Sequence, residues 1–199
     1  MQIERRFSSL DAGAYGDIAF VTRLIAQGPE AEDGEGDPVI VPAHFSQVAA
    51  EVMARSFCHA GGVPAILKPV PEDGVPEFLW RHEADLSALQ DLPADQRFGP
   101  ETDARQVFDR MAGAWTYWGW KGGYFDGPED ARAYLDEMRA MLARQMASPS
   151  PEQWQGTGLH WAYGIATGEP GFRVDPATGL AARADASHPR PYGHFIQSI

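Results

Sequence analysis

Few side chains in this chain could bind a metal ion or act as a nucleophile. Of the six histidines, His188 and His194 form the best candidate metal pair, with Asp185 nearby, but their spacing fits no helical His-Glu-x-x-His pattern. The single cysteine, Cys58, precedes His59, yet adjacent side chains near a helix end usually diverge. We therefore predict no metal site and no catalytic residue here, and we interpret Cys58 as a thiol packed against a helix.

Glycine groups and an aromatic run offer other routes to ligand binding. Neither Gly122-Gly123 nor Gly156 to Gly158 follows a clear strand with the spacing of a phosphate-binding loop. The run from Trp115 to Phe125 places six aromatic residues beside Lys121, and such rings can stack on bases. A net charge of −12 opposes binding to a phosphate backbone, so we expect these rings to pack between helices instead.

Length and composition indicate one domain with a sizeable hydrophobic core. The chain has 199 residues, of which 44% are apolar, and it holds 16 basic against 28 acidic side chains. No apolar run approaches the roughly 18 residues that a membrane span needs. A single cysteine excludes an intrachain disulfide. We expect a cytoplasmic protein that binds neither nucleic acid nor membrane.

The first half of the chain shows mostly short elements. Alternating apolar residues predict a strand from Asp17 to Ile25, and the acidic, glycine-rich stretch from Gly28 to Pro38 predicts a loop. Helical spacing predicts a short amphipathic helix within Ala43 to Phe57. The proline-rich residues 63–96 are interpreted as a connector that wraps around the domain.

Two longer helices carry the strongest periodic pattern. Acidic residues at Glu101 and Asp103 favour a helix start, and an apolar stripe predicts that this helix runs to about Trp115. A proline near the first position favours a second helix from Pro128, whose stripe continues to Met146. Because each helix has an apolar face, each needs a partner surface.

Six motifs occur in the same order in one known family. They are Glu4-Arg5-Arg6-Phe7, Ser46-Gln47-Val48-Ala49, the run from Ala104 to Phe125, Ala143-Arg144-Gln145-Met146, the run from Thr157 to Gly164, and Phe195-Ile196-Gln197-Ser198. Through these motifs the chain resembles the amino-terminal region of adenosylcobalamin-dependent, or class II, ribonucleotide reductases. The resemblance spans nearly the whole chain.

The resemblance implies a mainly α fold with a few short strands. In the family this region is a helical layer packed beside a ten-stranded α/β barrel, and Phe195 to Ile199 is expected to form the first barrel strand. We treat residues 1–199 as one domain. Its parts are an extended acidic stretch (1–42), a helix and connector (43–99), a helical pair (100–147), and glycine-rich and aromatic loops with a terminal strand (148–199).

The resemblance also implies where chemistry is missing. Family enzymes use a cobalamin-derived radical to form a thiyl radical on one cysteine, and two further cysteines then reduce the ribose; most of this machinery is expected beyond residue 199. At the place of one reducing cysteine stands His194, whose imidazole cannot form a disulfide. Pro151 and Gly156 replace two polar residues of the substrate loop. Gly156, Thr157 and Gly158 remain as candidate substrate-binding residues, whose backbone N–H groups could hold a nucleotide phosphate.

Two functions are compatible with this pattern. The first is a degenerate paralogue that is catalytically inactive alone and serves as a binding or regulatory module. The alternative is one piece of a split or truncated adenosylcobalamin-dependent reductase, completed in trans and converting ribonucleotides to deoxyribonucleotides. We expect residues 191–199 either to pair with the sheet edge of a barrel or of another protein, or to be poorly ordered in the isolated chain. Adenosylcobalamin is expected only when a barrel partner is present.

Overall fold

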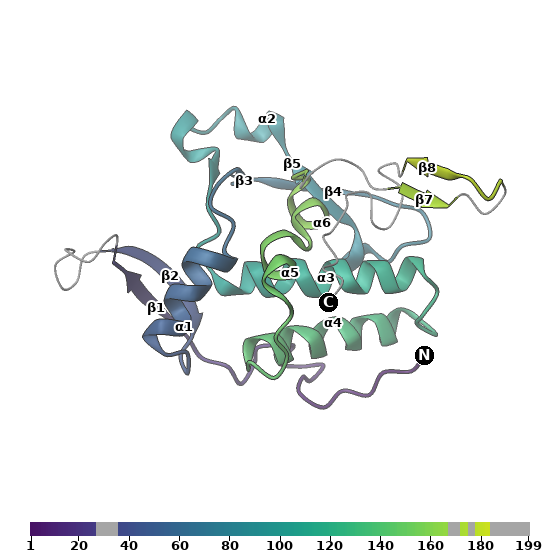
Figure 1. Ribbon diagram of the computed structural model, residues 1–199, viewed down its shortest axis with the longest axis horizontal. Coiled ribbons are helices and arrows are strands. Elements are labelled where there is room, and N and C mark those ends of the chain that lie inside the picture. Colours follow the sequence, from purple (N-terminus) through teal and green to yellow (C-terminus); the bar gives the residue numbers. More distant parts are fainter. Residues whose placement is uncertain (27–35, 167–171, 175–177, 184–199) are drawn as a thin grey trace.

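Helices form the centre of the structure, and small sheets flank them (Figure 1). The computed structural model describes residues 1–26, 36–166, 172–174 and 178–183. Two long helices, α3 (Ala104–Lys121) and α4 (Pro128–Ala143), lie side by side and make extensive contact. The shorter helices are α1 (Gln47–Val52), the π-helix η1 (Met53–Phe57), the 3-10 helices η2 (Glu77–Leu79) and η3 (Ala94–Gln96), α2 (Leu86–Leu89), α5 (Pro151–Gly156) and α6 (Leu159–Tyr163). No helix in the described part is long and apolar enough to cross a membrane.

The described strands pair two by two, and they form no barrel. Each pair is antiparallel. The pairs are β1 (Phe20–Ile25) with β2 (Asp37–Pro42), β3 (Val63–Pro64) with β6 (Phe98–Gly99), β4 (Leu67–Val70) with β5 (Arg81–Ala84), and β7 (Phe172–Val174) with β8 (Ala181–Arg183). The expectation of a mainly α fold is therefore corrected to a mixed fold. The expected barrel strand, Phe195 to Ile199, lies outside the described residues.

The first hairpin shows why strand content was underestimated. The predicted strand is confirmed as β1, but its partner β2 was not expected, and Asp37 and Pro38 belong to this strand instead of the predicted loop. Most of that loop lies outside the described residues. Pro38 and Pro42 lie near the two ends of β2. Each strand of a two-stranded sheet has one open edge, where a residue without an N–H group loses no hydrogen bond of the ladder. Val39 and Val41 of β2 are buried, which anchors the hairpin to the core.

The proline-rich segment 63–96 is more regular than a connector. It contains β3, β4, η2, β5, α2 and η3. In the β4–β5 hairpin, Pro69 lies opposite His82, and this strand again has an unpaired edge that tolerates a residue without an N–H group. The segment interpreted as a wrapping connector therefore contains short regular elements, because proline weakens strand patterns in a sequence without excluding edge strands.

The helix boundaries follow local capping. The short helix is confirmed as α1 and η1, and the Ser46 hydroxyl caps it by accepting a bond from the Ala49 N–H at 3.1 Å. Asp103 and Gln106 form a capping box at the start of α3. This helix continues to Lys121, beyond the predicted end at Trp115, and ends where Gly122 and the left-handed Gly123 follow.

The second long helix begins at Pro128 as predicted but ends at Ala143, before Met146. Gln145 adopts a left-handed conformation with φ 57°, which ends the helical path. The N–H group of Met146 then donates to the Met141 carbonyl at 2.9 Å, as in a Schellman cap. Apolar spacing continued past this cap, so periodicity alone could not locate the helix end.

The aromatic run from Trp115 to Phe125 divides between core and surface. Tyr117 is buried in a cluster with Leu79 and Trp161, which confirms packing for that ring. Tyr124, in contrast, is 66% exposed, so the expectation that all these rings pack between helices is only partly correct.

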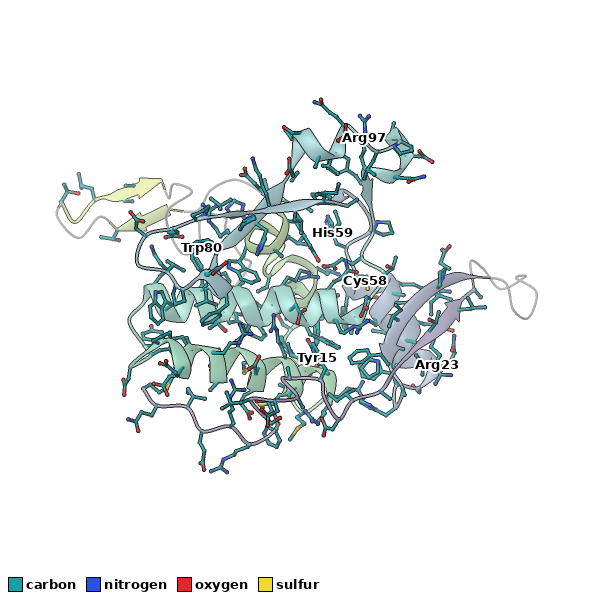
Figure 2. The ribbon with its side chains drawn as sticks, turned by 180° about the vertical axis from the view of Figure 1, so that it is seen from behind. Tyr15, Arg23, Cys58, His59, Trp80 and Arg97 are labelled. Carbon is teal, nitrogen blue, oxygen red and sulfur yellow. The ribbon has the colours of Figure 1, made fainter. Side chains whose placement is uncertain are left out.

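The first eight residues form an N-terminal strap along α4. The N–H group of Ile3 donates to Asp130 Oδ1 at 2.9 Å. Glu137 accepts the N–H groups of Phe7 and Ser8, with the shorter contacts at 3.0 and 2.9 Å, and also the Ser8 hydroxyl at 2.6 Å. Carboxylates spaced along one helix therefore fix the backbone of a segment that has no regular structure. Figure 2 shows this segment running along the helical pair.

Replacing Gly113 by alanine tests the packing of the helical centre. A Cβ atom at this position on α3 would overlap the ring of Trp161, and that ring is held by a bond from its Nε1 to the Leu79 carbonyl at 3.0 Å. We expect Gly113→Ala to lower the free energy of unfolding in urea by about 1–3 kcal/mol. Gly61→Ala is the matched control, because nothing lies near its added methyl group. Equal stability of both variants would contradict this packing.

Candidate functional site

The predicted substrate-binding residues form a tight corner between α5 and α6. Gly158 has φ 85°, and a side chain there would overlap the carbonyl of Arg110, so only glycine fits. Thr157 is fully buried, its N–H group donates to the Gln153 carbonyl at 3.0 Å, and its hydroxyl donates to Gln153 Oε1 at 2.5 Å. Gly156 is half-buried. The polar atoms of Thr157 are thus engaged within the protein.

Beneath this corner lies a buried arginine that projects from α3. Arg110 is 1% exposed, yet its guanidinium finds several backbone acceptors. Its Nη1 donates to the Thr157 carbonyl at 2.6 Å, and its Nη2 donates to the carbonyls of Trp154 at 2.7 Å and Phe57 at 3.0 Å. The arginine therefore joins the α5–α6 corner to the end of η1.

Glu101 neutralises this arginine. Arg110 Nε donates to Glu101 Oε1 at 2.9 Å, and the side chains of this ion pair are fully buried. The same oxygen accepts the Tyr163 hydroxyl at 2.9 Å, while Oε2 accepts the backbone N–H of His59 at 2.8 Å. Burial, together with the Glu101 charge, raises the pKa of Tyr163 well above its ordinary value. We call Arg110, Glu101, Tyr163 and Thr157 the Arg110 cluster.

The Arg110 cluster positions backbone instead of presenting reactive groups. A buried ion pair is tolerated only when its remaining donors and acceptors are satisfied, and here oxygens from four residues in three chain segments satisfy the guanidinium. Glu101 was interpreted from sequence as an acidic residue that favours a helix start. Its true partner lies nine residues away in the next helix, and no spacing rule links the two positions.

The Cys58–His59 pair has no features of a nucleophile and its base. Cys58 packs against the hydrophobic core, and burial, aided by the charge of Glu101, raises the pKa of its thiol to about 12. The backbone of His59 bonds to Glu101, as described above. These contacts confirm the interpretation of Cys58 as a packed thiol.

His160 is a titratable group that the sequence did not single out. Burial first, and the positive charge of Arg81 second, lower the pKa of this imidazole to about 4. Its Nε2 lies 3.3 Å from Arg81 Nη1. His160 is therefore neutral at pH 7 in the folded protein.

The candidate metal pair, His188 and His194, and the nearby Asp185 lie outside the described residues. Within the described ranges, no three His, Cys, Asp or Glu side chains are grouped closely enough to hold a metal ion. The position of His194 relative to the α5–α6 corner is therefore not part of the described geometry.

Comparisons with known proteins agree on one family. The profile described as "Class II vitamin B12-dependent ribonucleotide reductase" matches residues 34–145. A vitamin B12-dependent ribonucleotide reductase of Agrobacterium fabrum is 48% identical over the whole chain, which covers 16% of that relative. A relative of the same name from Bradyrhizobium diazoefficiens is 47% identical with the same coverage. A third, from Rhodopirellula baltica, is 28% identical over 50% of this chain and 10% of its own length.

Removing the buried guanidinium tests the Arg110 cluster. We expect Arg110→Met to lower the free energy of unfolding by about 3–5 kcal/mol, because it leaves the Glu101 carboxylate buried without its partner. The matched control is Arg105→Met, which removes a partly exposed partner of Asp103 and should cost about 1 kcal/mol or less. In the double variant Glu101→Gln/Arg110→Met, part of the loss should be recovered. Urea denaturation of the four proteins measures this, and a small loss for Arg110→Met would contradict the assignment.

The neutral state of His160 predicts a pH effect on stability. Unfolded histidine takes up a proton near pH 6.5, whereas the folded group resists protonation down to about pH 4. The unfolded state thus binds more protons in this window, and stability should fall as the pH decreases through it. His160→Gln should show a shallower fall in urea midpoints from pH 6.5 to 4. Parallel curves for both proteins would contradict the lowered pKa.

Proposed function

Because the chain belongs to the family of class II vitamin B12-dependent ribonucleotide reductases, we propose that it acts as a binding module without nucleotide-reducing activity of its own. The chain spans 16% of the two curated relatives that it matches over its full length. In this proposal its partner is the catalytic part of a reductase, and the module contributes a preorganised surface.

The state of the only thiol carries this proposal. Nucleotide reduction of the family type uses a thiyl radical and a pair of reducing cysteines, and two electrons leave the pair as a disulfide forms. This chain has one cysteine, Cys58, packed against the core with its pKa raised to about 12. Since His194 stands at the place of a reducing cysteine, no second thiol can complete the pair.

The geometry of the α5–α6 corner supports a positioning role. Thr157 is buried, and the Arg110 guanidinium donates to its carbonyl oxygen. A corner held in this way can present its outer side to a partner without rearranging. Association with a partner then carries no additional entropic cost for ordering this loop.

The surroundings of His160 do not suit an imidazole ligand for the cobalt of adenosylcobalamin. An imidazole that ligates cobalt must do so through an unprotonated ring nitrogen, and the lowered pKa of His160 meets that requirement. However, its Nε2 faces Arg81 Nη1 at 3.3 Å, which blocks the approach of a corrin ring. We assign cofactor binding to the partner and derive no step through the cofactor.

A second candidate function is completion of a reductase in trans. The match to the Agrobacterium fabrum relative over the whole of this chain favours it. In that case the chain docks onto a barrel that supplies the radical cysteine and the cofactor, and His194 occupies a position in the assembled site.

The two candidates give different results in one assay. The chain is incubated with a ribonucleoside diphosphate, adenosylcobalamin and a dithiol, alone or with the remaining part of the Agrobacterium fabrum reductase, and deoxyribonucleotide is quantified. We expect no product from the chain alone, either unmodified or as His194→Cys, because a lone introduced thiol lacks a radical partner.

In the mixture, binding without turnover supports the module. Turnover with the unmodified chain, raised further by His194→Cys, supports completion in trans, and the absence of added turnover with either form contradicts it. Deoxyribonucleotide formation by the unmodified chain alone would overturn both candidates. Circular dichroism of the His194→Cys variant serves as the control for folding.

A further inference from the structure

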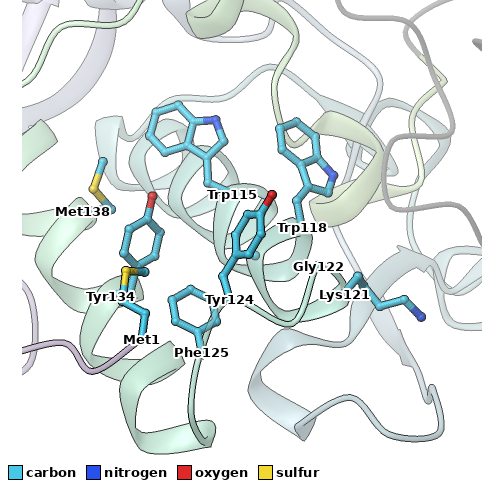
Figure 3. Close-up of a pocket in the computed structure, with 10 residues that line it drawn as sticks. Met1, Trp115, Trp118, Lys121, Gly122, Tyr124, Phe125, Tyr134 and Met138 are labelled. Atoms are coloured by element: carbon cyan, nitrogen blue, oxygen red, sulfur yellow. The ribbon is translucent and has the colours of Figure 1, made fainter.

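A hollow lined by aromatic side chains opens between the end of α3 and the start of α4 (Figure 3). Its volume is about 740 Å³, within the range of roughly 300–1,000 Å³ that is typical of small-molecule sites. The rings and apolar chains that shape it are Trp115, Trp118, Tyr124, Phe125, Tyr134 and Met138. Neither the Arg110 cluster nor the α5–α6 corner contributes a lining residue.

The walls of this hollow are built from packed rings. Phe125 and Tyr134 contact each other with ring centroids 5.4 Å apart. Gly119 allows the Phe125 ring to lie directly against α3, since a Cβ atom there would come within 2.7 Å of that ring. The absence of a side chain at one helical position therefore lets the Phe125 ring, tilted by 50° to the Tyr134 ring, line this wall.

Charged groups at the rim are already neutralised. Lys121 donates to Glu72 Oε1 at 2.5 Å, and Figure 3 shows its chain extending away from the rings. The terminal ammonium of Met1 forms an ion pair with Asp126. The hollow thus offers π faces and phenol hydroxyls, with neither lining ammonium left uncompensated for a phosphate.

Tyr124 covers part of the hollow and has freedom to adapt. Its ring is 66% exposed and, in Figure 3, stands between Trp118 and the Phe125–Tyr134 pair. The preceding Gly123 has φ 68°, while the Tyr124 N–H group donates to the Gly119 carbonyl at 3.0 Å. The backbone of this residue is therefore fixed, whereas its ring can rotate to stack on a ligand.

We propose that this hollow binds a planar heteroaromatic molecule of nucleoside size that carries no negative charge. Aromatic rings on several sides favour stacking with a flat π system, and the phenol hydroxyls of Tyr124 and Tyr134 can bond to heteroatoms at its edge. The net charge of −12 and the compensated rim disfavour anions. This site is separate from the module role proposed above and does not depend on it.

Tryptophan fluorescence provides a direct test, since two of the six tryptophans line the hollow. The full chain is titrated with adenosine as the uncharged planar probe and with adenosine monophosphate as its anionic counterpart, at an excitation wavelength that adenine does not absorb. We expect saturable quenching by adenosine and at least about fivefold weaker binding of the monophosphate, because its phosphate finds no free cation.

Variants locate the binding site. Tyr124→Ala should raise the dissociation constant for adenosine about fivefold or more, which is the lower range of one lost stacking contact. Because this ring is mostly exposed, the variant should remain folded. Phe98→Ala is the matched control: that ring is 47% exposed, lies on β6 away from the hollow, and should leave binding unchanged.

Three results would overturn the proposal. The first is no saturable quenching by adenosine at millimolar concentration. The second is equal affinity of the unmodified chain and Tyr124→Ala. The third is tighter binding of the monophosphate than of adenosine, which would require an uncompensated cation in the hollow. Each of these results leaves the binding-module proposal unaffected, because that proposal is tested by turnover and association with a reductase partner.

Discussion

The buried ion pair between Arg110 and Glu101 determines how the described segments meet. Moving two charges out of water is costly, and the cost is recovered only when the hydrogen-bonding groups of both side chains find partners. Here those partners come from the end of η1, the chain before α3, helix α5 and helix α6. The ion pair therefore determines which segments lie next to each other more than it adds to the free energy of unfolding. If one segment shifted, a buried charge would lose its partner.

The sequence predicted the two long helices well because their stability depends on local signals. The capping box at Asp103 and the proline at Pro128 are readable from neighbouring residues, and both start sites agree with the structure. Strands β2 and β4 were not predicted because each contains proline, which weakens a strand pattern. The Arg110 cluster could not be predicted at all, since it joins residues that become neighbours only after the chain has folded.

The candidate site illustrates a related limit. Gly156, Thr157 and Gly158 were selected through a family resemblance, and the structure places them on a corner whose central residue is buried. The aromatic run from Trp115 to Phe125 is, in contrast, less buried than its composition indicated. Composition favoured complete burial, yet the spacing of Gly119 and Gly123 leaves some rings at the border of a hollow. Glycine positions that create space are harder to interpret from sequence than side chains that fill it.

The N-terminal strap has a consequence for biosynthesis. Its backbone bonds join Ile3 to Asp130 and Phe7 to Glu137, residues that the ribosome produces more than a hundred peptide bonds later. During translation the strap therefore remains solvated until Asp130 and Glu137 have been synthesised. The attachment closes loops of more than a hundred residues, so the strap can dock only after α4 has been synthesised.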